Sequence, residues 1–171
     1  MNEARHRSAN PGRRLAAGLA LAFSLFLAGC AGGLGSVDVG ATHGVPVDRQ
    51  LALASINAFR AENGLPALRF NATLDQVAER QARAMAARGD LSHTVDGGLA
   101  DRVRASGYEV IAAAENLGWN YPSTPAVITG WKTSAGHRKN LLNPRVREIG
   151  FAAAAGPNGQ PYWALVMGAQ G

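Results

Sequence analysis

The sequence predicts an α+β domain with an antiparallel sheet, because helical periodicity dominates the first half and a strand hairpin closes the chain. Two strand-like segments, 146–155 and 162–168, flank the turn sequence Gly-Pro-Asn-Gly at 156–159. A length of 171 residues indicates one domain with a core large enough to need no covalent staples. The single cysteine excludes an intramolecular disulfide and a cysteine-based zinc or iron–sulfur site.

The N-terminal segment is predicted to be a signal peptide. Four arginines precede an unbroken apolar run at 15–28, which is shorter than the roughly 20 residues that a membrane-spanning helix needs. Cys30 directly follows the sequence Leu-Ala-Gly. This pattern resembles the lipobox of bacterial lipoproteins. The resemblance implies removal of residues 1–29, acylation of Cys30 and a lipid anchor in the cell envelope, at the outer membrane if the cell has two membranes. A plain secretory signal with an incidental cysteine is the alternative.

The remainder of the chain carries little net charge. Without residues 1–29 it has thirteen basic and eleven acidic residues, a net charge of +2. No basic stripe interleaved with aromatic residues is present, so no nucleic-acid partner is expected. Residues 30–47 are glycine-rich and lack periodicity, which predicts a flexible tether, with His43 as a solvated loop residue, ahead of a folded domain at 48–168.

Helix signals follow in order along this domain. Asp48 is expected to cap a helix that reaches Asn63, and Thr73 begins a capping-box pattern for a second helix that Gly89 ends. Further helices are expected at 99–106, from Thr124 through Trp131, and at 134–142. A strand is predicted at 108–113, and 114–121 is expected to be a loop or irregular segment.

Three residues stand out as candidates for chemistry. His93 follows the second predicted helix, Glu115 follows an apolar stretch, and His137 lies in the last predicted helix. A glutamate after an apolar stretch needs a polar partner. Two imidazoles and one carboxylate could form a divalent cation site, such as a zinc site, or an acid–base cluster. Their spacing alone also fits ordinary surface or core histidines, and leaves these alternatives open.

A set of short motifs then occurs in a distinctive order. They are Glu62-Asn-Gly-Leu-Pro66, Leu91-Ser-His93, Gly107-Tyr108, Ala114-Glu-Asn-Leu117, Trp131-x-x-Ser-x-Gly-His-Arg138, Asn140-Leu-Leu-Asn-Pro144, Ile149-Gly150 and Tyr162-Trp163. Together they resemble the bacterial branch of the CAP superfamily, also called the SCP domain (cysteine-rich secretory proteins, antigen 5 and pathogenesis-related 1). The resemblance covers about 48–168. It implies an α-β-α sandwich with a central antiparallel sheet.

The resemblance also implies a site. Members of the family line a central cleft with two histidines and two glutamates, and His93, Glu115 and His137 match three of these positions. Ser134 stands where the second glutamate is expected. This departure leaves one carboxylate fewer to hold a cation, so a zinc ion, if bound, is expected to be held weakly by His93, Glu115 and His137.

Three functions are compatible with this sequence. The favoured one is an envelope-anchored module whose cleft, lined by His93, Glu115, Ser134 and His137, binds a lipid, cell-wall or protein ligand. The second is a hydrolase that uses Ser134, His137 and Glu115 as a triad, or a zinc ion held by histidine and glutamate. The third is a structural envelope lipoprotein. No catalytic activity is assigned from the sequence.

Overall fold

A computed structural model of the chain describes residues 37–171. The predicted signal peptide, the predicted lipidation site Cys30 and the start of the predicted tether lie outside the described residues. None of the helices formed by residues 37–171 combines the length and the apolar character needed to cross a bilayer.

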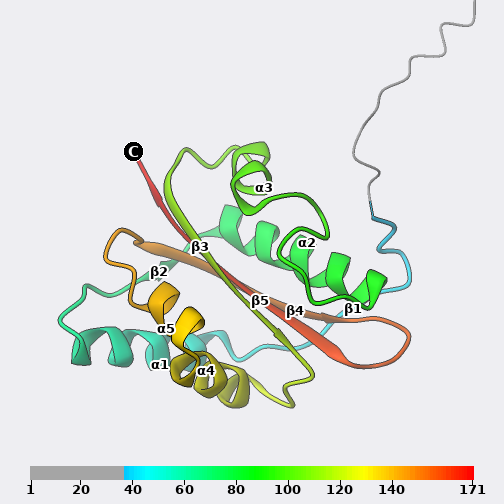
Figure 1. Cartoon of the computed structure of the whole chain (residues 1–171), viewed down its shortest axis with the longest axis horizontal. Coiled ribbons are helices and arrows are strands. Elements are labelled where there is room, and N and C mark those ends of the chain that lie inside the picture. The colour runs from blue at the N-terminus through cyan, green and yellow to red at the C-terminus, as the bar shows by residue number, and fades with distance from the viewer. Residues whose placement is uncertain (1–36) are drawn as a thin grey trace, which may run out of the picture. The chain divides into compact units, whose positions relative to one another are not determined.

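The described residues form helices and strands in the order that Figure 1 shows. The helices are α1 (Arg49–Glu62), α2 (Ala72–Arg88), α3 (Leu99–Ala105), α4 (Thr124–Thr133) and α5 (Ala135–Leu141). The strands are β1 (His43–Gly44), β2 (Arg69–Phe70), β3 (Val110–Trp119), β4 (Glu148–Ala155) and β5 (Pro161–Gln170).

The strands form one sheet between two helical layers, which confirms the predicted fold class. The strand order is β1-β4-β5-β3, and the long strands β3, β5 and β4 pair antiparallel. The short β2 adds parallel to the start of β4. Helices α2 and α3 cover one face, whereas α1, α4 and α5 cover the other (Figure 1). Strand β3 is therefore an edge strand, paired on one side with β5 and on its outer side with none of the described strands.

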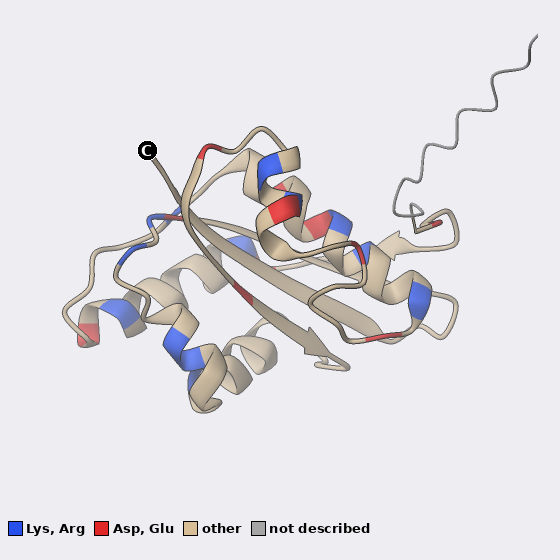
Figure 2. Ribbon diagram, turned by 45° about the horizontal axis from the view of Figure 1, so that its top comes forward, with Lys and Arg blue, Asp and Glu red and all other residues tan. Residues whose placement is uncertain are grey.

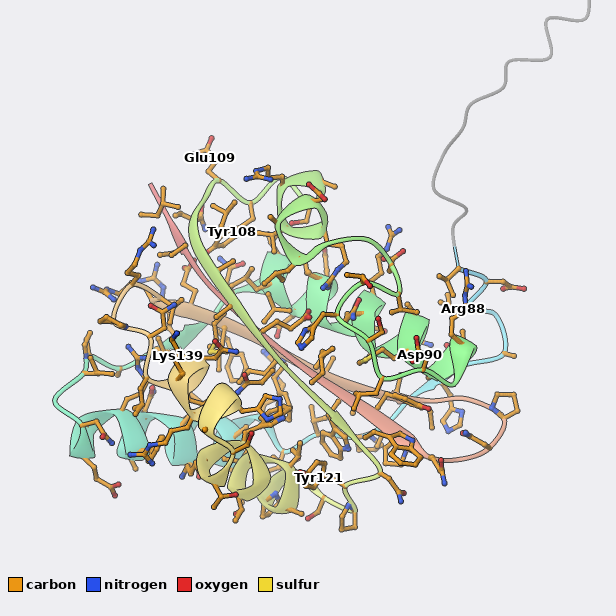
Figure 3. The ribbon with its side chains drawn as sticks, viewed as in Figure 1. Arg88, Asp90, Tyr108, Glu109, Tyr121 and Lys139 are labelled. Atoms are coloured by element: carbon orange, nitrogen blue, oxygen red, sulfur yellow. The ribbon has the colours of Figure 1, made fainter. Side chains whose placement is uncertain are left out.

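Each sheet face has its own apolar core because side chains alternate along the strands. On β5, Trp163 packs in the core beneath α1, α4 and α5, while Tyr162 packs beneath α2 and α3. Trp163 Nε1 donates to the carbonyl of Tyr121, 3.1 Å away, in the turn after β3 (Figure 3). At Gly150 on β4, a Cβ would overlap the backbone of Leu74. Helix α2 thus approaches the sheet as closely as a glycine allows.

The start of α2 corrects the predicted capping box. Asn71, rather than Thr73, is the N-cap, and its side-chain oxygen accepts from the backbone amides of Thr73 (2.9 Å) and Leu74 (3.2 Å). The helix consequently begins at Ala72. Its predicted end is confirmed, because Gly89 adopts the left-handed conformation that stops a helix (φ 65°).

The prediction of a loop at 114–121 was wrong. Residues through Trp119 continue β3, and each residue from Ala112 to Trp119 is paired with β5. The sequence suggested a loop because Glu115 and Asn116 interrupt the apolar pattern. Both are nevertheless buried, since polar groups from neighbouring elements hydrogen-bond to them.

The structure also extends the folded domain into part of the segment predicted as a tether. Residues His43 and Gly44 pair with β4, and the amide of Val45 donates to Ala153 O at 2.9 Å. Val45 and Val47 pack against the core beneath α1. These valines are the apolar anchors that the glycine-rich composition concealed. His43 is exposed, as expected, but it lies in a strand.

Candidate functional site

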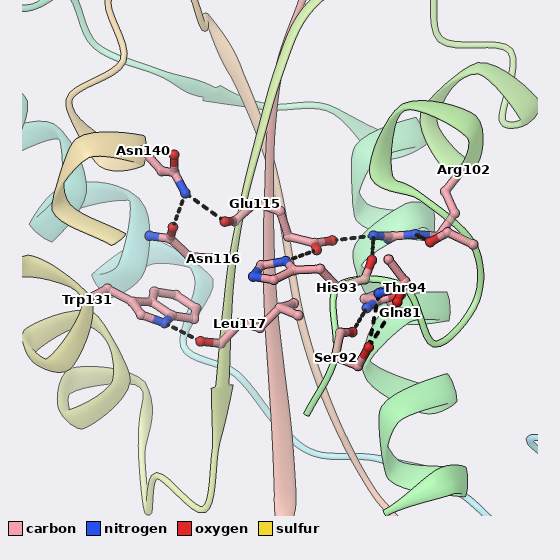
Figure 4. Close-up of polar contacts among 11 residues, drawn as sticks. Gln81, Ser92, His93, Thr94, Arg102, Glu115, Asn116, Leu117, Trp131 and Asn140 are labelled. Carbon is pink, nitrogen blue, oxygen red and sulfur yellow. Dashed lines mark hydrogen bonds and ion pairs between the residues drawn. The ribbon is translucent and has the colours of Figure 1, made fainter. Parts of the chain in front are cut away.

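The candidate site crosses the outer edge of β3. Glu115 lies in the middle of this strand, His93 lies in the loop after α2, and His137 lies on α5. Alternation along β3 directs Glu115 toward the α2 and α3 layer and Asn116 toward the α5 layer. Glu115 Oε2 and His93 Nδ1 are 2.7 Å apart, and Figure 4 marks the interaction between them. A carboxylate only accepts hydrogen bonds, so Nδ1 carries the proton and Nε2 is left free.

Arg102 is the part of the site that the sequence did not reveal. Its side chain is 5% exposed, and Nη2 donates to Glu115 Oε1 at 2.8 Å. The same guanidinium donates to the carbonyls of His93 (3.3 Å) and Gly97 (3.2 Å). One arginine on α3 therefore neutralises the buried carboxylate and holds the loop that carries His93. The only sequence signal was an arginine in a short amphipathic helix, which usually indicates a solvated face.

The opposite layer is fixed to β3 by amide and indole groups. Asn116 Nδ2 donates to the carbonyl of His137 at 3.1 Å, which ties α5 to the strand. Asn140 Nδ2 donates to Glu115 O (2.9 Å) and Asn116 Oδ1 (3.0 Å). Trp131 Nε1 donates to the carbonyl of Leu117 at 2.9 Å (Figure 4). Side chains from α4 and α5 thus satisfy the outward-facing carbonyls of this edge strand, which would otherwise be open to pairing.

We call the set formed by His93, Arg102, Glu115, Asn116, His137 and Asn140 the edge cluster. Its two histidines differ in environment. The His93 side chain is 60% exposed although its Nδ1 is held by a carboxylate that is only 2% exposed. Burial lowers the pKa of His137 below its ordinary value, and the nearby His93 lowers it further. His137 is accordingly neutral at pH 7, and its ring lies 6.4 Å from that of Trp131.

The edge cluster does not fit the three-ligand zinc site predicted from His93, Glu115 and His137. Within residues 37–171, no three His, Cys, Asp or Glu side chains are placed to hold a metal ion together. The physical reason is Arg102, since its guanidinium occupies Glu115 Oε1 while His93 occupies Oε2. With Ser134 in place of a second carboxylate, at most two imidazole nitrogens remain, fewer than the three protein ligands typical of an open zinc site.

The predicted triad of Ser134, His137 and Glu115 is not assembled either. Glu115 orients His93, which leaves no carboxylate hydrogen-bonded to His137 among the described residues. Ser134 ends α4 and precedes α5, and its side chain makes no capping hydrogen bond there. The geometry that activates a serine needs a base on the hydroxyl and an orienting group on the base. Within residues 37–171, this arrangement is absent at Ser134.

Comparisons with known proteins agree with this architecture. The chain is similar to "Uncharacterized membrane protein YlbC" of Bacillus subtilis, with 33% identity over 96 residues, and to "Uncharacterized protein YkwD" of the same organism, with 31% identity over 96 residues. Each match covers 55% of this chain, but only 28% and 37% of the respective relatives. The chain thus corresponds to one part of these longer proteins.

Solved structures share the fold. An outer surface protein from Borrelia burgdorferi superposes with a TM-score of 0.69 at 19% identity, covering 75% of this chain and 98% of that one. An extracellular protein containing a SCP domain from Bacillus anthracis gives a TM-score of 0.59 at 26% identity, covering 68% of this chain and 39% of that one. The model of the cysteine-rich secretory protein family, CAP, matches residues 53–167. This chain therefore belongs to the cysteine-rich secretory protein family, as the order of its motifs predicted.

Proposed function

We propose that this protein is an exported, lipid-anchored envelope module that binds a ligand at the edge cluster. The observation that carries the proposal is the state of His93, whose ring is 60% exposed although a buried, arginine-paired carboxylate fixes its Nδ1. Burying a carboxylate beside a guanidinium is costly unless both are well bonded. A polar network of this kind, ending on an open ring nitrogen, is suited to present one hydrogen-bonding atom to a partner.

The two histidines define the chemistry of that partner. With Nδ1 bonded to the Glu115 carboxylate, His93 presents Nε2 to a partner as its open hydrogen-bonding atom. His137 is neutral at pH 7, because its pKa is lowered, and therefore offers one donor and one acceptor. Groups of this type suit hydroxyl-bearing ligands, such as the glycan of an envelope polymer. This chemistry favours a binding module over the hydrolase, for which neither the serine triad nor the three-ligand zinc site is formed within residues 37–171.

The anchor belongs to the same proposal and rests on the sequence. The apolar run at 15–28 and Cys30 directly after Leu-Ala-Gly match a lipoprotein signal. Export is further supported by the Bacillus anthracis relative, which is described as extracellular. Cys30→Ser is expected to leave protein that is unprocessed or no longer recovered with membranes, because the acylated thiol is lost. Processing and membrane recovery equal to the parent would contradict the anchor.

Ligand binding is tested with the full chain, purified in a nonionic detergent. Soluble peptidoglycan glycan fragments are titrated in, and the imidazole resonances of His93 and His137 are followed by NMR. We expect both histidines to shift together, and His93→Ala to abolish the response. The matched control is His43→Ala, since His43 is exposed in β1 and outside the edge cluster. Phosphatidylglycerol vesicles form a second arm. A response to neither probe, or one that persists in His93→Ala, would overturn the proposed site.

A further inference from the structure

A second polar region lies at the end of the sheet where β4 begins and β5 ends. A cavity of about 510 Å³ is lined there by Ala67, Leu68, Arg69, Arg147, Glu148 and Gln170. This volume lies within the range of small-molecule sites, roughly 300 to 1,000 Å³. Glu148 is on β4, two strands away from Glu115 on β3. The cavity shares no residue with the edge cluster.

The buried carboxylate in this cavity is already satisfied. Arg69 donates to Glu148 Oε1 through Nε (3.1 Å) and Nη2 (2.7 Å). Glu148 Oε2 accepts from the hydroxyl of Tyr108 (2.7 Å) and from Gln170 Nε2 (3.2 Å). These hydrogen bonds lower the pKa of Glu148 despite its burial. The carboxylate therefore stays charged, and Arg69 balances that charge.

The neighbouring arginines, by contrast, have no acidic partner within residues 37–171. Arg147 lines the cavity, and its guanidinium donates through Nη1 to the carbonyls of Pro144 (2.6 Å) and Val146 (2.8 Å). Arg145, two residues earlier, donates through Nη2 to the carbonyl of Ile111 at 2.8 Å. Neither arginine forms an ion pair with a described acid. Figure 2 shows blue segments of Lys or Arg near the end of the sheet where the C-terminus lies.

A buried arginine, Arg60, is the third arginine near this cavity, after Arg145 and Arg147, that has no acidic partner within residues 37–171. Arg60 is 0% exposed, and it donates to the carbonyls of Pro66 (2.9 Å), Leu141 (2.7 Å) and Asn143 (3.0 Å). Its Nη2 has no hydrogen-bond partner among the described residues. Pro66 directly precedes Ala67 and Leu68 in the cavity wall. Burial lowers the pKa of Arg60, and the charge of Arg147 lowers it further. A buried cation held only by carbonyls is costly, and a nearby anion reduces that cost.

We infer that this cavity is a binding site for a small ligand carrying an oxyanion, a phosphate or a carboxylate group, with Arg147 as its main contact. Both carbonyl bonds of Arg147 come from Nη1, so Nε and Nη2 keep N–H donors for a ligand. The planar guanidinium places these donors to match phosphate and carboxylate oxygens. Ala67 and Leu68 provide an apolar wall for the remainder of the ligand, and Arg69 balances the charge of Glu148 in the same cavity. The inference does not depend on the function proposed for the edge cluster.

The test uses the full chain in nonionic detergent at low ionic strength. Methyl phosphate and N-acetyl-alanine are titrated separately, with uncharged N-acetyl-alaninamide as the neutral control. The readout is the Arg147 Nε–Hε resonance in NMR spectra. A single oxyanion is expected to bind with a Kd on the order of 1 mM, and binding should weaken as salt is added. The stronger of the two responses identifies the phosphate or the carboxylate source.

Matched variants make the result decisive. Arg147→Gln is expected to weaken binding about 10-fold to 100-fold, the range for loss of a hydrogen bond to a charged group. Arg147→Lys keeps the positive charge but loses the paired N–H donors of the guanidinium, and should give an intermediate affinity. Arg104→Gln, at an exposed side chain of α3, should bind like the parent. Because Arg147→Gln cannot report its own Nε–Hε, its binding is followed by calorimetry. Binding of neither oxyanion, or equal binding by Arg147→Gln and the parent, would overturn the inference.

Discussion

At the scale of single residues, Arg102 does more for the edge cluster than either histidine. It is the counter-charge of Glu115 and a donor to two carbonyls of the 93–97 loop. Removing one partner of a buried ion pair leaves the other charge uncompensated, which costs far more than losing a surface pair. The orientation of His93 therefore depends on a residue that belongs to none of the motifs in the sequence.

Arg102→Ala is expected to lower the free energy of unfolding by about 3–5 kcal/mol, the range for breaking a buried ion pair. The control is Arg104→Ala on the same helix, where the side chain is 67% exposed and pairs weakly with Asp101. That change should stay within about 0.5 kcal/mol. Urea unfolding measures both variants. If the two lose equal stability, Glu115 does not depend on Arg102.

The lowered pKa of His137 predicts a pH effect on stability. The folded protein binds this proton less readily than the unfolded chain, so the unfolded state holds more protons below about pH 6.5. Stability contributed by His137 is thus complete above that pH and declines as the pH falls toward the lowered value. His137→Gln should flatten the dependence of unfolding free energy between about pH 7.5 and 5.5. His43→Gln, in exposed β1, should not. An unchanged slope in His137→Gln would contradict this interpretation.

At the scale of elements, β3 shows where sequence patterns succeed and fail. The turn sequence Gly-Pro-Asn-Gly at 156–159, between two strand-like segments, predicted the hairpin of β4 and β5. Gly89 predicted the end of α2, since both signals are local. The second half of β3 could not be predicted, because Glu115 and Asn116 are tolerated in a buried strand only through partners on α3 and α5. Arg102 belongs to none of the motifs, and although Asn140 begins one of them, its local pattern does not show that it contacts β3.

The contact between α2 and β4 gives a prediction at the same scale. Gly150→Ala places a methyl group against the backbone of Leu74, and backbone cannot move aside as a flexible side chain can. We expect a loss of about 3 kcal/mol or more, at the upper end for overpacked sites. Gly136→Ala on α5 is the matched control, since outside the adjacent backbone of its own helix no described atom lies within 4 Å of its Cβ position. It should be neutral or stabilising, by up to about 1 kcal/mol. Thermal unfolding of both variants decides the matter, and equal midpoints would show that α2 can shift.

At the scale of the whole molecule, the ordered motifs predicted the family, the sandwich and the three residues His93, Glu115 and His137. They did not predict how these residues are connected. The motif positions suggested either that His93, Glu115 and His137 share a metal ion or that Glu115 orients His137. In the folded chain Glu115 instead pairs with Arg102 and His93. The folded domain also begins earlier than the predicted residue 48, because β1 at His43–Gly44 pairs with β4. This long-range contact is not indicated by the glycine-rich composition.

The boundary predicts the effect of truncation. A chain that begins at Asp48 lacks β1 and the partly buried Val45 and Val47. It should unfold with a free energy at least about 1 kcal/mol below that of a chain beginning at Val37. Val45→Ala in the full chain should show a smaller loss of the same sign. Urea unfolding compares the three proteins. If the chains beginning at Val37 and at Asp48 are equally stable, residues 43–47 contribute nothing to the folded domain and belong to the tether.

The proposed binding site depends on a free Nε2 on His93, so the protonation of this ring is the decisive measurement. Long-range ¹H–¹⁵N spectra of the histidine rings report which nitrogen carries the proton. The hydrogen bond to Glu115 predicts that His93 holds its proton on Nδ1 at pH 7.5, and that Arg102→Ala shifts its ring resonances while those of His43 stay fixed. If His93 is protonated chiefly on Nε2, or if its resonances do not respond to the loss of Arg102, then Glu115 and Arg102 do not fix this ring and the proposed site is wrong.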